Sequence, residues 1–370
     1  MAPDITHSAL AGQWHLHTDQ NFYAGLQPNP AFVDIVTPVV QQFLGVVNSI
    51  ASDYIIELAR TSTPRQPHYE DLFSLAYQAS RPEVDHTPNL AVVEFLRRLR
   101  AQAAHLHVGF KGPTGSTGLV GLGEAACHFL HWVVYHMLTT GTQPRSGLDP
   151  ITDVANHVDE LDIFTLNHDV LIEAQCRANG VAFEDGFSDR RGELRAFSGW
   201  PENSREKVRL FKLHGSVNWF LYDFPGWARQ YAIPDSDAFH SHDQNGNLVR
   251  PVEWKPAFLS GTVVKEQLYG IGFFGDLFTA FRRNLAPHVH LIVCGYGFGD
   301  PGINSRIDQW LSDRLDGSNK LVVLNKGPEA DFFADKPYWL QDLHAHGRLI
   351  LIDKWLQDCT VADLTPYFDN

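Results

Sequence analysis

The feature that most constrains the fold of this chain is a change in hydrophobic pattern near residue 151. Beyond this point, apolar runs of four to six residues alternate with amphipathic stretches of helical spacing. Strands that alternate with helices are typical of a parallel sheet with crossover helices, and unbroken apolar runs fit strands covered on both faces. The sequence therefore predicts an α/β fold in which helices flank a parallel sheet. The expected strands are Leu161–Leu166, Val208–Leu213, Val289–Cys294, Leu321–Leu324 and Leu349–Ile352.

The N-terminal half of the chain follows a different pattern. Apolar residues there recur at helical spacing, which predicts helices over 38–60, 68–79, 89–107 and 122–139. We therefore expect a mostly helical part, residues 1–150, that is inserted in or packed on a core of residues 151–370, so that both form one compact catalytic unit. Residues 221–260 have weak periodicity and are rich in Pro, Gly and Asp, so we expect an excursion from the sheet that acts as a lid.

Charge and composition argue against several classes of protein. A formal charge of −14 disfavours a broad nucleic-acid-binding surface, so direct binding to nucleic acid is not expected. The chain has neither the apolar run of a membrane span nor the N-terminal pattern of a signal peptide. Its four cysteines form no C-x-x-C pair, so we expect no zinc or other metal site. All but Cys359 lie in stretches that predict burial, and buried free thiols are typical of the cytoplasm, where we place the protein.

One strand-to-helix turn has clear sequence signals. Asp300 is a good helix N-cap, Pro301 suits the first turn, and Gly317 is expected to end the helix. The preceding residues, 295–299, contain three glycines. These glycines either form a tight turn or let the backbone approach a ribose or phosphate.

Two polar residues follow predicted strands and are candidates for chemistry. Asn167 comes after the first strand and His214 after the second, and residues at the carboxyl ends of parallel strands can converge on one crevice. Each has a structural alternative, because Asn167 could cap the next helix and His214 could be a hydrogen-bonded turn residue. Together, an orienting amide and an imidazole base are sufficient to break an activated glycosidic bond.

Four segments, in this order, resemble the sirtuin-like domain of bacterial anti-phage defence proteins. They are Thr165–Asp169, Lys212–Trp219, Val293–Asn304 and Leu321–Lys326, and Lys212–Ser216 is the most specific of them. The likeness covers residues 150–330 and extends more weakly to His68–Leu72. It implies a Rossmann-like core that binds NAD, and an NAD glycohydrolase that releases nicotinamide and ADP-ribose as the toxic effector of abortive infection.

The resemblance also implies roles for individual residues. Asn167 would orient the nicotinamide ribose or the attacking water, and His214 would act as the general base. The other expected NAD contacts are Asp169, Ser216, Gly295, Tyr296, Gly297, Asp300 and Asn325. The activity of such an enzyme must be controlled, because it would otherwise deplete the cell of NAD. The resemblance therefore further implies a homo-oligomer or a partner such as a HerA-like ATPase or a short Argonaute.

Two departures from the family keep other functions open. No strand followed by a Gly-Ala-Gly loop can be found; Gly115–Gly118 has the composition but lies between predicted helices. Its absence favours a weakly active scaffold that binds NAD or ADP-ribose. The zinc module of protein-deacylating sirtuins is also absent, which argues against an NAD-dependent deacylase, the remaining alternative.

Overall fold

The computed structural model describes residues 4–14, 30–58, 66–81, 90–140, 142–201, 206–224, 228–235, 241–252, 255–314, 316–334 and 336–368. The chain divides into two compact units. Unit 1 contains residues 1–140, 191–194 and 217–265, and unit 2 contains 141–190, 195–216 and 266–370. The expected excursion therefore groups with the N-terminal helices, whereas the sequence assigned it to the core of residues 151–370. That it acts as a lid stays a prediction.

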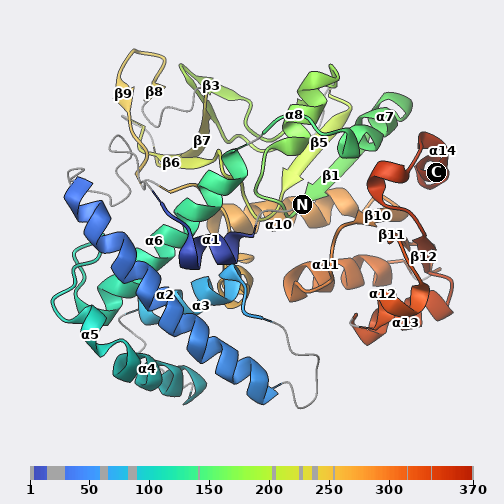
Figure 1. Ribbon diagram of the computed structural model, residues 1–370. Coiled ribbons are helices and arrows are strands. Elements are labelled where there is room, and N and C mark those ends of the chain that lie inside the picture. The colour runs from blue at the N-terminus through green and yellow to red at the C-terminus, as the bar shows by residue number, and fades with distance from the viewer. Residues whose placement is uncertain are drawn as a thin grey trace. The chain divides into compact units, whose positions relative to one another are not determined.

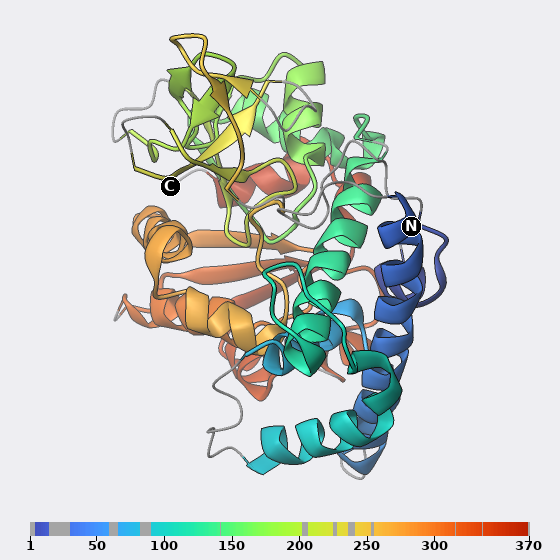
Figure 2. The same cartoon turned by 90° about the vertical axis from the view of Figure 1, so that its left-hand side faces the viewer.

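Unit 1 is built mainly from helices, as its apolar periodicity predicts. They are α1 (Ile5–Ala11), α2 (Pro30–Leu58), α3 (Tyr69–Ala79), α4 (Leu90–Gln102), α5 (Ala104–His107) and α6 (Gly118–Thr139). The long helices α2 and α6 pack against each other and cross in the view of Figure 1 (Figures 1 and 2). Helix α2 begins earlier than predicted and contains Pro38 in its interior; residues 59–60 of the predicted helix lie outside the described residues. Gly123 lets α6 approach α3, because a Cβ there would lie 2.8 Å from the carbonyl oxygen of Ala76.

Short antiparallel strands complete unit 1. Strand β6 (Phe220–Tyr222) pairs with β7 (Gln230–Pro234), and β8 (Ser241–His242) pairs with β9 (Leu248–Val249). Strands β3 (Asp189–Arg191) and β4 (Leu194–Ala196) and helix α9 (Thr262–Leu268) lie where the chain passes between the units.

Unit 2 contains two parallel three-stranded sheets. Five of these six strands match the predicted runs to within one residue, and the sixth, β2, was not predicted. In the first sheet, β5 (Val208–Lys212) lies between β1 (Leu161–Thr165) and β2 (Phe183–Glu184). In the second, β11 (Lys320–Leu324) lies between β10 (His290–Cys294) and β12 (Leu349–Ile352). The α/β class with helix-flanked parallel sheets is therefore confirmed.

Helices cover the strands of unit 2. They are α7 (Asp149–His157), α8 (Leu171–Ala178), α10 (Gly272–Leu285), α11 (Pro301–Ser312), α12 (Glu329–Phe333), α13 (Tyr338–Ala345) and α14 (Val361–Leu364), with 3-10 turns η2 (Ser146–Leu148), η3 (Leu356–Asp358) and η4 (Thr365–Tyr367). One apolar cluster joins α7 and α14 to strands of both sheets through Val154, Leu364, Val208 and Leu324. Helix α11 ends at Ser312 rather than near Gly317.

The cysteines show a second difference from the sequence. Cys359, expected to be the exception, is buried in the apolar cluster, and Cys294 at the end of β10 is exposed.

Among the described residues, none of the helices has the length and apolar character to cross a membrane. The described part of the chain likewise holds no group of three or more His, Cys, Asp or Glu side chains placed to bind a metal ion.

Candidate functional site

The predicted site residues all follow the carboxyl ends of the parallel strands of unit 2. Asn167 and Asp169 come after β1, His214 and Ser216 after β5, residues 295–300 after β10, and Asn325 after β11. In parallel α/β sheets this edge is where ligands bind. The tertiary contacts decide which of these residues act together.

His214 is buried and held by two partners from other elements. Its Nε2 lies 2.8 Å from the Tyr269 hydroxyl oxygen and 3.2 Å from Asp300 Oδ2. The same hydroxyl donates to Asp300 Oδ2 at 2.5 Å. Tyr269 has one proton and gives it to the carboxylate, so His214 Nε2 must itself carry a proton to bond both oxygens. In the neutral tautomer the lone pair then lies on Nδ1, which is the nitrogen able to accept a proton.

Asp300 supplies the negative charge of this arrangement and also begins α11. Its Oδ1 accepts hydrogen bonds from the backbone N–H groups of Gly302 and Ile303, as the capping signal predicts. Burial works to raise the pKa of Asp300, but the hydrogen bonds from His214 and Tyr269 outweigh it and lower the pKa to about 2. Asp300 is therefore ionised at neutral pH and orients the imidazole, much as a carboxylate does in a catalytic triad.

Tyr269 is the member of this group that the sequence did not predict. Its ring stacks on Phe278 with centroids 3.7 Å apart, and the Cδ2 and Cε2 atoms of the ring lie next to Gly302. A Cβ at Gly302 would lie 2.2 Å from the ring, so only glycine permits this position. Tyr269 stands alone after α9, and no motif around it could have identified it.

The turn after β1 is fixed by a buried ion pair. Lys212 Nζ lies 3.0 Å from Glu173 Oε1 and also donates to the carbonyl oxygen of Asp169. Asp169 Oδ1 in turn accepts from the N–H of Leu171, where α8 begins. Asn167 lies outside this helix and is exposed. The alternative that Asn167 caps the helix is therefore wrong, because the N-cap position belongs to Val170 and the first N–H of the helix bonds to Asp169.

Ser216 and Asn325 occupy structural positions. The Ser216 side chain is fully buried, and its hydroxyl donates to the carbonyl oxygen of His168, so it holds the β1–α8 turn. The backbone N–H of Asn325 donates to the carbonyl oxygen of Ile352 and continues the β11–β12 ladder. That either residue contacts NAD stays a prediction.

The turn after β10 leaves open space beside its glycines. A Cβ at Gly295, Gly297 or Gly299 would meet no described atom within 4 Å, so neighbouring side chains do not require glycine there. Gly295 has φ 68°, and Phe298 has the rarer non-glycine value of 58°. The Tyr296 hydroxyl donates to Asn304 Oδ1 at 2.9 Å and accepts from the Asp300 N–H. A strained turn held this firmly, with room beside its backbone, fits a surface for a ribose or phosphate.

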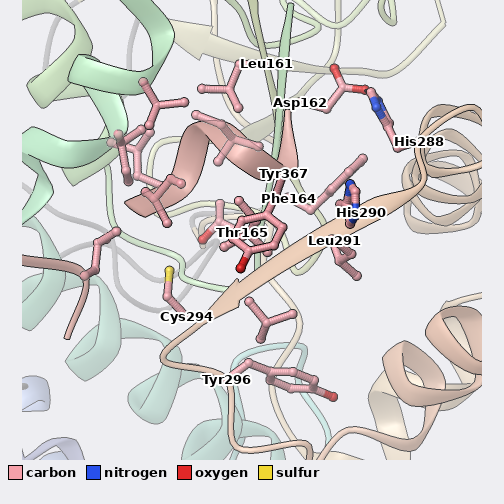
Figure 3. Close-up of a pocket in the computed structure, with 18 of the residues that line it drawn as sticks. Leu161, Asp162, Phe164, Thr165, His288, His290, Leu291, Cys294, Tyr296 and Tyr367 are labelled. Atoms are coloured by element: carbon pink, nitrogen blue, oxygen red, sulfur yellow. The ribbon is translucent and has the colours of Figure 1, made fainter. Parts of the chain in front are cut away.

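A cavity of about 740 Å³ lies between β1 and β10, and Figure 3 shows side chains of both strands around it. Asn167, Asp169, Gly295 and Tyr296 line it. His214, Ser216, Gly297, Asp300 and Asn325 do not belong to its lining. The structure therefore places four of the predicted residues around the cavity and Asp300 beside His214, whereas no described contact assigns Ser216, Gly297 or Asn325 to either group.

We expect the Asp300 carboxylate to contribute stability that disappears in acid. Because its folded pKa lies below the ordinary value, the contribution is present above pH ~4 and is lost as the pH falls toward the folded value. Asp300→Asn should lower the unfolding free energy by about 2 kcal/mol at pH 5, and the difference from wild type should shrink near pH 2.5. Urea denaturation at the two pH values measures this; a difference that does not change with pH contradicts it.

Comparison with protein families gives a match over slightly less than half of the chain. Residues 162–345 match the family described as SIR2-like domain. Comparison with curated proteins gives no match. The matched stretch holds every predicted site residue, together with Tyr269, and SIR2-like domains are Rossmann-like and bind NAD. Residues 162–345 thus form a sirtuin-like domain with an NAD-related activity.

Proposed function

We propose that this protein is an NAD glycohydrolase that cleaves NAD to nicotinamide and ADP-ribose. One observation carries the proposal: His214 is buried in a domain that matches the SIR2-like family and is oriented there by the ionised Asp300 and by Tyr269. This is the arrangement of a base held by a third group.

The chemistry requires little beyond these residues. Nicotinamide leaves NAD as a neutral molecule from a pyridinium, so its departure needs no general acid. The anomeric carbon passes through an oxocarbenium-like state that water captures. His214 Nδ1 would take the proton from the attacking water or from a ribose hydroxyl, and Asp300 would stabilise the imidazolium that results. Asn167, exposed at the end of β1, would orient the sugar or the water.

The described residues fit one part of NAD better than the other. The open backbone at Gly295, Gly297 and Gly299 suits a ribose or phosphate. The turn after β1 is Asn167-His168-Asp169 and contains no glycine, and the family's Gly-Ala-Gly sequence occurs in none of the described strand-to-helix turns. We therefore expect weak NAD binding by the chain alone.

The biological role follows from the resemblance to defence proteins. A free NAD hydrolase would deplete its own cell, so we propose that assembly or a partner controls the activity during phage infection. A HerA-like ATPase or a short Argonaute is the expected partner, and a homo-oligomer is the alternative form of control. Because the chain has a formal charge of −14, we propose that any sensing of nucleic acid belongs to the partner.

A second candidate is a scaffold that binds NAD or ADP-ribose without cleaving it. The missing phosphate loop favours this function, whereas the oriented His214 opposes it. The two functions are distinguished by measuring nicotinamide release from NAD alongside binding of ADP-ribose, with the purified chain alone and with a co-encoded ATPase. Turnover in either preparation supports the hydrolase, and binding with no turnover in both supports the scaffold.

Replacement of Asn167 separates its chemical role from a structural one. We expect Asn167→Ala to reduce nicotinamide release at least about tenfold, since the amide orients the reacting groups, and to leave the urea midpoint unchanged because the residue caps no helix. The exposed Asn245 provides the control, and Asn245→Ala should change neither quantity. Full turnover by Asn167→Ala would remove Asn167 from the mechanism.

A further inference from the structure

Helix α9 carries a lysine that is buried. The Lys265 side chain is 7% exposed, and its Nζ lies 2.5 Å from Oε1 of Glu70 in the first turn of α3. Lysine is almost never buried unless an opposite charge pairs with it, because an unpaired ammonium would lose its hydration without compensation. Lys265 and Glu70 both belong to unit 1. The ion pair therefore attaches α9 to α3 at one defined place.

The backbone at the start of α9 is also packed on α3. Gly261 has φ 84°, and a Cβ there would lie 2.6 Å from Ser74 Oγ and 2.9 Å from Phe73 Cδ1. The carbonyl oxygen of Gly261 accepts a hydrogen bond from the N–H of Lys265 at 3.1 Å. Helix α9 is thus attached to α3 through its backbone and, one turn later, through a charge. Two attachments fix both the position and the rotation of a helix.

Tyr269 is the first residue after α9. It follows Lys265 by four residues, which is about 6 Å along a helix. The division between the units falls inside α9, directly after Lys265, so Tyr269 belongs to unit 2 together with His214 and Asp300. Because a hydrogen-bonded helix keeps its length, the backbone of Tyr269 is held at a constant distance from Lys265.

The Tyr269 hydroxyl has little tolerance for displacement. It lies 2.8 Å from His214 Nε2 and 2.5 Å from Asp300 Oδ2. A shift of about 1 Å away from His214 would lengthen the first contact beyond the range of a hydrogen bond. The ring stacks on Phe278, but offset stacking permits a range of positions within the plane of the rings. Movement of the hydroxyl toward or away from His214 is therefore limited chiefly by the backbone of Tyr269.

We propose that Glu70 and Lys265 are positioning residues for the catalytic base. They act through α9 on Tyr269 and keep its hydroxyl in contact with His214 Nε2, so that Nδ1 stays in the proton-accepting tautomer. This role rests on the proposed function, since it assigns the pair to the base of that reaction. It also gives a task to the segment His68–Leu72, which the sequence resemblance included without one.

A charged pair suits this role better than an apolar contact. Apolar attraction has no direction, so an apolar α9 could slide or rotate on α3 at little cost. The buried ammonium of Lys265 must instead stay beside Glu70, because separation would leave a charge unpaired. Replacement of a buried ion pair by apolar residues of similar volume is often neutral for stability. A role in positioning can therefore be separated from a role in stability.

The double variant Glu70→Leu/Lys265→Met makes this separation, because it removes both charges and keeps similar side-chain volumes. Its urea midpoint should stay close to that of wild type. Its kcat for nicotinamide release should fall at least about tenfold, the scale for a displaced catalytic group. KM for NAD should change less than about twofold, because neither residue is among the expected NAD contacts. A folded double variant with the wild-type kcat would overturn the proposal.

Two further variants support this comparison. Glu70→Asp keeps the charge and shortens the side chain by one methylene, so it replaces the double variant should that one not fold; its kcat should fall roughly threefold. The control is Arg98→Met on α4, which removes an ion pair with Glu94 in the same unit but not on α9. Arg98→Met should leave kcat unchanged, and an equal loss in this variant would contradict a specific role for α9.

A cycle with Tyr269→Phe tests the route of the effect. Tyr269→Phe alone should lower kcat, because the hydroxyl that bonds His214 Nε2 is gone. When the pair acts through this hydroxyl, its removal in the Tyr269→Phe background should change kcat less than about twofold. Effects that multiply in the combined variant would show that the pair acts by another route, and the proposal would fail.

Nitrogen NMR of the His214 ring gives a readout that needs no turnover. In wild type, Nε2 should give the signal of a protonated nitrogen, which is assigned by its loss in His214→Gln. In the Glu70→Leu/Lys265→Met variant, the signal should move toward its position in Tyr269→Phe. An unmoved signal overturns the positioning role. A signal that moves in a protein without nicotinamide release supports the contact and contradicts only the hydrolase.

Discussion

His214→Gln is expected to lose nicotinamide release by a factor of roughly 100 to 10,000, the range for removal of a general base. The glutamine amide can still donate a hydrogen bond to Asp300 or Tyr269, but it cannot accept a proton near neutral pH. The substitution therefore removes the titrating group and keeps its bonds.

Stability measurements separate this chemical loss from damage to the fold. His214 is 4% exposed and bonded to two side chains, so His214→Ala should cost roughly 1–3 kcal/mol of unfolding free energy as well as turnover. His214→Gln should stay close to wild type in the same urea titration. His346→Ala, at the exposed histidine that directly follows α13, is the matched control and should change neither quantity. Turnover by His214→Gln at the wild-type rate would assign the chemistry to another residue.

Lys212→Met is expected to cause the largest loss of stability, about 3–5 kcal/mol. The Lys212 and Glu173 side chains are 2% and 5% exposed, so removal of the cation leaves a carboxylate buried without its charge partner. The bond from Lys212 to the Asp169 carbonyl is lost at the same time, which loosens the turn that presents Asn167.

A double substitution tests whether the charge, and not the packing, is responsible. Lys212→Met combined with Glu173→Leu removes both charges, and it should recover much of the stability that Lys212→Met alone loses. The control pair is Lys326 and Asp353, whose side chains are 51% and 69% exposed, and Lys326→Met should leave the urea midpoint unchanged. Losses that simply add in the double variant would show that the two side chains do not interact.

Local sequence predicted the elements of unit 2 well. The apolar runs of β1, β5, β10, β11 and β12 and the Asp300 cap are properties of neighbouring residues, and the structure has them at the expected positions. Local signals failed to predict the start of α8 and the end of α11. The first N–H of α8 bonds to Asp169 and not to Asn167, and α11 ends at Ser312, a residue that nothing in the local pattern marks as its end.

The site is a different case, because its geometry depends on contacts between distant segments. His214 was predicted from its place after a strand, but Tyr269 is 55 residues away and enters only because Gly302 leaves room for its ring. No regular spacing of residues in the sequence predicts that contact. The same is true of the Lys212–Glu173 pair, which joins β5 to α8 across 39 residues.

The sequence by itself determined the parallel α/β class, the strands and the polar residues that follow them, since hydrophobic periodicity and capping are local properties. Only the tertiary structure decided that the parallel strands form two sheets with a cavity between β1 and β10. Periodicity reports that a strand is buried, but pairing depends on which edges meet in space. For the same reason, only the tertiary structure could join Asp300, Tyr269 and His214 into one hydrogen-bonded group.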